Sequence, residues 1–451
     1  MAETITCKAV EGLPSESAAA AVPARKALMA GFASTFGWAL DLFDLFILLY
    51  VAPIIGRLFF PSDQPTLSLA AVYASFAVAL LVRPLGSAIF GTYADRHGRK
   101  GALTIAMVGV GLSTAAFGLL PTIQQAGVIA PLLFLSLRVV QGIFVGGIVA
   151  STHTIGTESI APQHRGLMSG LVGSGGAGMG ALLASSVYFV LSQVFPGDEF
   201  DQIGWRVMFF SGLVSTVFGL AMYRFLDETP AFKQMKAARE RQGKHVDQVS
   251  PLRRLFTGEY RNVLLVNLLI TFGGGATYYI TAGYLPTLLK MVAGVTHADS
   301  SRILMIGSVG TIAGALIFGA LSDRIGRKRT FYILGCMSLV MLPYLFTAIA
   351  QPAELGAITA MACGISLLGG AIIAPVLIFL NERFPTTLRA SGTGLSWNIG
   401  FALGGLMPTL VSLVSATPQD IPRVLAITSA VLAVVYLIGA KVVPETQNKF
   451  D

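Results

Sequence analysis

Charged residues are scarce in this chain of 451 residues: they make up 12% of it, whereas 54% of the residues are hydrophobic and the mean hydropathy is +0.72. So few charges cannot cover the surface of a soluble globule of this length. Cysteine is also scarce, and its three copies are too scattered for a disulfide or metal framework. The composition therefore predicts a protein that is solvated by lipid and binds no metal.

Enzyme motifs are missing as well. The sequence contains no P-loop, no H-E-x-x-H, no paired-cysteine motif and no G-x-S-x-G in a soluble context. Short Gly-x-Gly runs from Gly170 onward have no strand pattern around them, so they are not a dinucleotide site. Residues 1–24 lack the continuous apolar core of a cleavable signal. We expect neither an enzyme nor a bound cofactor.

Twelve charge-poor apolar runs of about 20 residues are long enough to cross a bilayer as helices. In the first half they lie near 28–55, 66–90, 101–121, 128–157, 166–195 and 205–225. In the second half they lie near 262–289, 303–321, 330–350, 355–381, 390–416 and 422–443. The sequence therefore predicts an all-α membrane protein with two six-helix bundles, 28–225 and 262–443. A tail (1–27), a linker (226–261) and a second tail (444–451) flank the bundles.

Two motifs occur twice, about half a chain apart. Gly91–Lys100 (GTYADRHGRK) closely matches Gly319–Lys328 (GALSDRIGRK), and each closes an apolar run. The second repeat pairs an acidic with a basic residue at the same spacing: Glu158 with Arg165, and Glu382 with Arg389. Internal repeats of this kind predict that the two bundles are pseudo-symmetric.

Lysine and arginine are distributed unevenly between the loops. If the N-terminus is cytoplasmic, the outer side has only five of the 31 basic residues: Arg57, Arg206, Lys290, Arg302 and Arg423. Basic residues are enriched on the cytoplasmic side of membrane proteins, so we expect both termini and the repeated motifs there. The formal net charge of +8 then reflects topology and contact with membrane lipid, and no nucleic-acid partner is expected.

Four charged residues of the first half lie deep within predicted spans: Asp41, Asp44, Arg83 and Arg138. A charge at the bilayer centre costs about 2.5–3.5 kcal/mol on insertion scales, so such residues are normally paired, interior and functional. A buried carboxylate can carry a proton, and an adjacent Arg helps the proton to leave. Asp41 and Asp44 are therefore the predicted proton-coupling residues, with a static ion pair as the alternative.

The second-half spans contain no formal charge until their ends, which leaves polar and aromatic side chains as candidates for a cavity. The predicted substrate-binding residues are Arg83, Arg138, Gln141, Tyr278, Tyr279, Trp397 and Asn398. An interfacial aromatic belt is the alternative for the tyrosines, and neutralisation of an Asp is the alternative for the arginines.

Charges of the repeated motifs can pair in one conformation and separate in another. The predicted conformational latch residues are Asp95, Arg96, Arg99, Glu158, Arg165, Asp323, Arg324, Arg327, Glu382 and Arg389. Surface ion pairs are individually weak, so only a network would bias the conformation. The alternative is that these residues only orient the protein in the membrane.

Several motifs carry a family resemblance. The doubled G-x-x-x-D-R-x-G-R-K, Arg138–Gly142 (RVVQG) and the six-plus-six layout resemble the major facilitator superfamily over the whole chain. Four segments are similar to metabolite:proton symporters, with sialate and monocarboxylate symporters as near relatives: Gly37–Asp44 (GWALDLFD), Arg83–Gly86 (RPLG), Gly204–Arg206 (GWR) and Asp227–Phe232 (DETPAF). That group usually has Glu-x-x-Asp where this chain has Asp41 and Asp44, which leaves the substrate open.

The resemblance implies a monomer in which two halves alternate access to a central site, with the latches holding the outward-open state. We therefore expect an inner-membrane carrier that uses the proton gradient to import a small carboxylate-bearing metabolite, an organic anion. The alternatives are a proton-coupled carrier of a zwitterion such as proline or betaine, a drug-type exporter, an uncoupled uniporter and a transport-like receptor.

Overall fold

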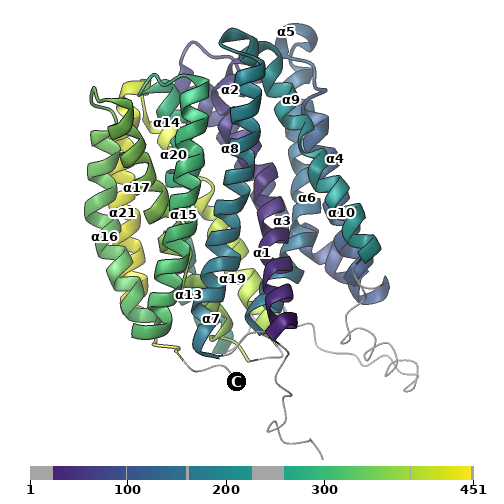
Figure 1. Ribbon diagram of the computed structural model, residues 1–451, viewed down its shortest axis with the longest axis vertical. Coiled ribbons are helices and arrows are strands. Elements are labelled where there is room, and N and C mark those ends of the chain that lie inside the picture. The colour runs from purple at the N-terminus through teal and green to yellow at the C-terminus, as the bar shows by residue number, and fades with distance from the viewer. Residues whose placement is uncertain (1–23, 98, 159–161, 226–258, 386–387, 448–451) are drawn as a thin grey trace, which may run out of the picture.

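The computed structural model describes residues 24–97, 99–158, 162–225, 259–385 and 388–447. Every regular element within these ranges is a helix, and the long helices run side by side as a single bundle (Figure 1). The predicted linker 226–261 lies almost wholly outside the described residues.

The described helices follow the predicted spans in order. The first half contains α1 (Ala24–Tyr50), α2 (Ala52–Phe59), α3 (Pro65–His97), α4 (Arg99–Phe117), α5 (Ile123–Ala126), α6 (Ile129–Glu158), α7 (Arg165–Gly170), α8 (Gly176–Val194), α9 (Trp205–Phe210) and α10 (Leu213–Phe225). The second half contains α13 (Glu259–Tyr278), α14 (Leu285–Met291), α15 (His297–Ile325), α16 (Arg327–Ala348), α17 (Leu355–Ile373), α18 (Val376–Asn381), α19 (Arg389–Gly404), α20 (Met407–Val414) and α21 (Ile421–Val442).

These helices make twelve spans, because several spans are built from two helices. Nine described helices or helix pairs are long and apolar enough to cross a bilayer, and α1 with α2, bent by 60°, forms another. Pro53 lies at the start of α2 and has no N–H to continue the α1 ladder. The remaining two spans are α4, which is shorter, and α9 with α10, which a turn at Ser211 separates. The predicted twelve-helix, all-α fold is confirmed.

The two halves pack against each other along α8 with α15 and along α3 with α20. Small residues allow the close approach: a Cβ at Gly178 of α8 would lie 2.7 Å from the Ile312 side chain of α15. In lipid, such close packing holds helices together in place of a hydrophobic driving force. The glycine-rich sequence of this span therefore serves the contact between halves.

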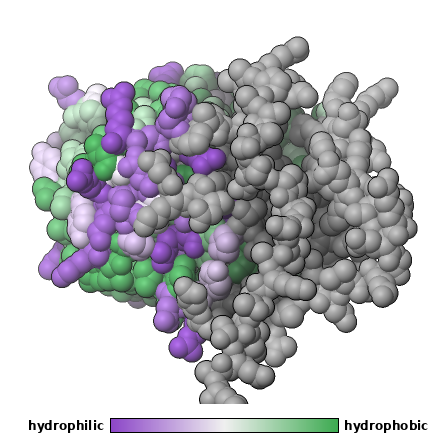
Figure 2. All heavy atoms as spheres, turned by 90° about the horizontal axis from the view of Figure 1, so that it is seen from below, coloured by the Kyte–Doolittle hydropathy of each residue, from purple (hydrophilic) through white to green (hydrophobic). Residues whose placement is uncertain are grey.

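The two ends of the bundle are formed by different helices. We call the lower end in Figure 1 the motif end, since α7, the start of α16 and residues 443–447 lie there; α2, α5, α9 and α14 lie at the opposite end. Figure 2 views the motif end, where hydrophilic side chains gather on the coloured part of the face, with hydrophobic ones among them. This polar face is consistent with the predicted cytoplasmic side, which stays a prediction.

Candidate functional site

A cluster of charged side chains lies in the middle of the first half. α1 supplies Asp41 and Asp44, α3 supplies Arg83, and α6 supplies Arg138 and Gln141. All five are buried, and Asp44 is only 1% exposed. They line one narrow space together with Phe76 and Leu80 of α3. The structure thus brings together the four deep charges of the first-half spans.

Arg138 is held by neutral groups rather than by an Asp. Its Nη1 donates a 2.6 Å hydrogen bond to Oε1 of Gln141, whose Nε2 donates at 2.7 Å to Oγ1 of Thr114. The guanidinium also lies over the Phe117 ring, 4.3 Å from its centroid. This planar stacking and hydrogen bonding fix the guanidinium without neutralising its charge.

Asp41 and Arg83 form the only ion pair of the cluster among the described residues, and it is long. Nη1 of Arg83 lies 4.0 Å from Oδ2 of Asp41. Within the described part of the chain, neither oxygen of Asp41 accepts a hydrogen bond, and Nε and Nη2 of Arg138 donate none. Asp44 lies near the hydroxyls of Ser215 and Thr114. Buried groups without partners are costly. The geometry therefore favours a site that receives a proton or a ligand over a closed static ion pair.

Aromatic side chains of the second half pack against Phe76, which lines this space. Tyr279 belongs to the π-helix Tyr279–Gly283, which follows α13. Its ring meets Phe76 of the first half edge-on, with centroids 5.2 Å apart. The neighbouring Tyr278 is buried, and its hydroxyl has no hydrogen-bond partner in the described chain. Both predicted tyrosines therefore face the interior of the bundle.

A stack of aromatic rings continues from Tyr279 into α19. Phe401 lies 6.0 Å from the Tyr279 ring and stacks on Trp397 at 4.0 Å. Trp397 in turn meets Trp38 of α1 edge-on at 6.2 Å. The rings thus form an aromatic wall between the halves, which we define as Phe76, Tyr279, Phe401, Trp397 and Trp38.

Asn398 is half-buried and is not one of the residues that line the central space in the described structure. The structure therefore does not join it to the cluster. Sequence reasoning in turn missed Phe76 and Phe401 because isolated phenylalanines in an apolar helix carry no signal of a site. Trp38 was detectable, since it lies one helical turn before Asp41.

The second-half latch residues form a compact ionic cluster at the motif end. Arg327 donates to Oδ1 of Asp323 at 2.8 Å and to both oxygens of Glu382 at 3.0 and 3.2 Å. Burial raises the pKa of Glu382, and this outweighs the opposing hydrogen bonds and charge of Arg327. Glu382 and Arg389 are not paired with each other in this conformation: Arg389 donates to the Asn381 carbonyl at 3.2 Å, and their role as a latch stays a prediction. The spacing of residues in the sequence could not show that Arg327, at the start of α16, would bind Glu382.

The other latch residues are placed less closely or lie outside the described side chains. Arg324 is exposed and is not part of the ionic cluster. Arg165 begins α7 at the motif end. The four remaining latch side chains lie outside those that the structure describes: Asp95, Arg96, Arg99 and Glu158.

Comparison with known proteins points to one family. Residues 27–409 match the family model of the Major Facilitator Superfamily. A proline/betaine transporter of Salmonella typhimurium is 30% identical over 429 residues, covering 94% of this chain and 84% of the relative. The inner membrane metabolite transport protein YhjE of Escherichia coli is also 30% identical, covering 92% of this chain and 94% of the relative. The expectation of sialate and monocarboxylate symporters as near relatives is not supported.

The fold also matches solved structures. The partially occluded, inward-open xylose transporter XylE of Escherichia coli superposes with a TM-score of 0.71, covering 94% of this chain and 99% of that chain. Sequence identity is 16%, so the likeness concerns the fold alone.

Proposed function

Because this chain belongs to the major facilitator superfamily and is a transporter rather than an enzyme, we propose that it carries a small zwitterion, such as proline or a betaine, together with protons. The expectation of an organic-anion substrate finds no support among the relatives, whereas the zwitterion alternative does. A zwitterion still presents a carboxylate to the buried arginines, so their predicted role is retained within the proposal.

The proposal rests on one observation: buried guanidinium groups and aromatic rings lie at the same place in the bundle. Arg138 and Arg83 offer guanidinium donors that suit a carboxylate. The aromatic wall begins at Phe76, which lines the same space as the arginines, and its rings are of the kind that attract an alkylated ammonium group. A carboxylate and an ammonium separated by one or two carbon atoms could meet both in a single pose.

Proton coupling follows from competition for Arg83. While Asp41 is charged, it shares Arg83 at 4.0 Å and competes with the substrate carboxylate. Once Asp41 binds a proton, that competition ends and Arg83 is available to the substrate. Proton binding and substrate binding would therefore favour each other, which is the linkage that symport needs. Asp44, without a cationic partner in the described structure, is the second carrier of this proposal.

We propose that the two halves move relative to each other, so that the central site opens to one side of the membrane at a time. The halves touch at the motif end through α7 with α15, and at the opposite end through Tyr73, which stacks on Tyr284 at 5.0 Å and bonds to Thr287 at 2.8 Å. Transport requires each set of contacts to open in turn. We propose that the motif end is cytoplasmic and that the protein is a monomer in the inner membrane.

The test is uptake by the purified chain in proteoliposomes. Labelled glycine betaine and proline should exchange in counterflow and accumulate when an inward proton gradient is imposed, and succinate should not. Exchange of succinate alone would restore the organic-anion interpretation. Binding without exchange would indicate a receptor, and exchange unaffected by a pH jump would indicate a uniporter.

A further inference from the structure

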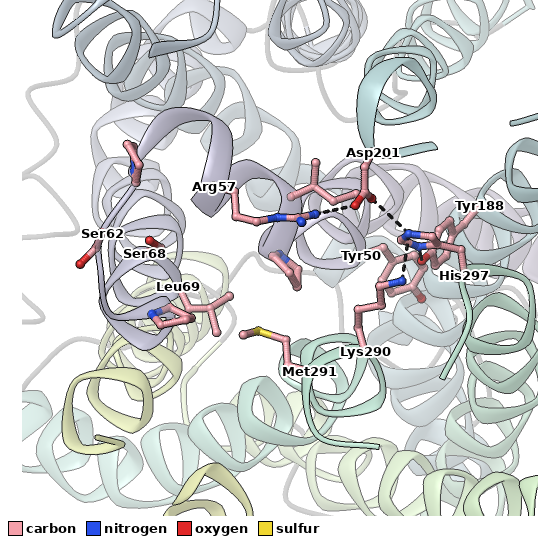
Figure 3. A pocket seen from close by; sticks show the side chains of 14 residues that line it. Tyr50, Arg57, Ser62, Ser68, Leu69, Tyr188, Asp201, Lys290, Met291 and His297 are labelled. Carbon is pink, nitrogen blue, oxygen red and sulfur yellow. Dashed lines mark hydrogen bonds and ion pairs between the residues drawn. The ribbon is translucent and has the colours of Figure 1, made fainter. Parts of the chain in front are cut away.

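A second polar cluster lies between the halves at the opposite end, away from the central site. It borders a cavity of about 620 Å³, a volume within the range of small-molecule sites. Figure 3 shows the labelled side chains arranged around this space. The first half contributes Tyr50, Arg57, Tyr188 and Asp201, and the second half contributes Lys290, Met291 and His297.

His297 is the centre of the cluster. Its Nδ1 lies 2.6 Å from the Tyr188 hydroxyl, and its Nε2 lies 3.0 Å from Nζ of Lys290 and 3.1 Å from Oδ1 of Asp201. A lysine ammonium can only donate a hydrogen bond, whereas a carboxylate can only accept one. The single Nε2 therefore cannot satisfy both neighbours at once.

The protonation of His297 decides which neighbour it serves. Without a proton on Nε2, the ring accepts a hydrogen bond from Lys290. With both nitrogens protonated, Nδ1 donates to the Tyr188 oxygen and Nε2 donates to Asp201, and the positive ring repels Lys290. Lys290 is then without an acceptor on His297 and borders the open cavity.

Three other charged residues surround His297 and Lys290: Asp201, Arg57 and Asp198. Burial opposes the charge of Asp201, but hydrogen bonds from His297 and Arg57 outweigh it and lower the pKa of Asp201 to about 2, so this carboxylate stays charged. Nη2 of Arg57 bonds to Oδ2 of Asp201 at 2.6 Å; the Arg57 side chain is 63% exposed and has further N–H donors. Asp198, on the exposed loop before Asp201, adds a further negative charge near Lys290.

We propose that this cavity is a second binding site, which takes the carboxylate group of a small organic ion between Lys290 and Arg57 when His297 is protonated. Leu69 and Met291 line the same space and provide contact for an apolar body. Tyr50 borders the cavity beside Tyr188, and the ring centroids of the two lie 6.1 Å apart. The identification of the cavity as an access site for the transported zwitterion rests on the proposed function.

The test uses trifluoroacetate, a carboxylate probe whose binding to the purified full chain broadens its fluorine NMR line. Broadening should be stronger at about pH 5.5 than at about pH 8, because lower pH favours the protonated imidazole. Lys290→Gln should weaken binding at pH 5.5 about tenfold, the scale of one charged hydrogen bond. Lys441→Gln, which removes an exposed lysine at the motif end, is the matched control, and His297→Gln should remove the pH dependence.

Three outcomes would overturn the site: equal binding in Lys290→Gln and Lys441→Gln, retained pH dependence in His297→Gln, or loss of binding in Arg138→Gln but not in Lys290→Gln. The last would place the probe in the central site. Glycine betaine should displace the probe if the cavity is an access site. A probe that binds through Lys290 but resists glycine betaine would overturn that role and assign the cavity to free organic anions. Failure of betaine exchange in proteoliposomes would separately reject the proposed function.

Discussion

Asp323 of α15 joins the two halves at the motif end, because its Oδ1 accepts a 2.8 Å hydrogen bond from the backbone N–H of Gly166 in α7. Its Oδ2 accepts another from Leu167, also at 2.8 Å. Arg327 binds the same carboxylate and links it to Glu382. Asp323 thus belongs both to the ionic cluster of the second half and to the contact between halves.

Asp323→Asn should therefore favour opening of the motif end. The amide is uncharged and has a single acceptor oxygen, so at least one charged hydrogen bond is lost, worth about 1.5–3 kcal/mol. Maleimide labelling of a cysteine at Leu167, in a chain without its native cysteines, should become about tenfold faster or more. Asp299→Asn, at the far end of the same helix, is the control. Equal labelling in both variants would show that Asp323 is no latch.

Arginine at positions 83 and 138 should not be replaceable by lysine without loss of substrate binding. Lysine keeps the charge but loses the planar donor fork, and at position 138 it also loses the stacking on Phe117. Glycine betaine affinity, measured by calorimetry, should fall by about 1.5–3 kcal/mol in at least one of the two variants. Unchanged affinity in both would remove carboxylate recognition from these residues.

Asp41→Asn should abolish accumulation driven by an inward proton gradient while leaving some substrate exchange. The amide preserves shape but cannot titrate, and exchange needs only reorientation of the loaded carrier. Asp44→Asn is the paired comparison and Asp63→Asn, an exposed loop carboxylate, is the neutral control. Wild-type accumulation and pH dependence in Asp41→Asn would place coupling elsewhere. Loss of binding in both buried variants would make the acids structural partners of the arginines.

Trp397→Leu should weaken binding of glycine betaine more than Trp397→Phe does. A ring face attracts a quaternary ammonium group by about 0.5–2 kcal/mol, and leucine offers no such face. Titration of both variants with glycine betaine measures the difference. Equal affinities would exclude Trp397 from ammonium recognition and leave it a packing role against Phe401 and Trp38.

Asp201→Asn should reduce the sensitivity of the fold to strong acid. The pKa of Asp201 is about 2 in the folded protein, below its ordinary value of 3.8. A depressed carboxylate pKa stabilises the folded state above the unfolded-state pKa, and this stability is lost as the pH falls towards 2. The decrease in thermal unfolding temperature between pH 4 and pH 2 should therefore be smaller in Asp201→Asn than in wild type or Asp63→Asn. Parallel decreases in all three would contradict this role.

The spans could be predicted because membrane insertion depends on local composition. The apolar runs near 66–90 and 330–350 became α3 and α16, since only an internally hydrogen-bonded helix is stable in lipid. The predicted span near 28–55 hid the 60° bend between α1 and α2. Its length and hydropathy were visible, but the direction of the chain after Pro53 depends on the neighbouring helices.

The sequence by itself determined that four charges lie deep in the first half and that two motifs recur at matching positions. Both features can be recognised locally, from the apolar residues around each charge and from the repeated residues themselves. Only the tertiary structure decided their partners. Arg138 meets Gln141 and Phe117, Glu382 meets Arg327 rather than Arg389, and Tyr279 of the second half packs edge-on against Phe76 of the first half. These contacts depend on how helices distant in sequence are rotated and packed against each other, which the spacing of residues along a single helix does not determine.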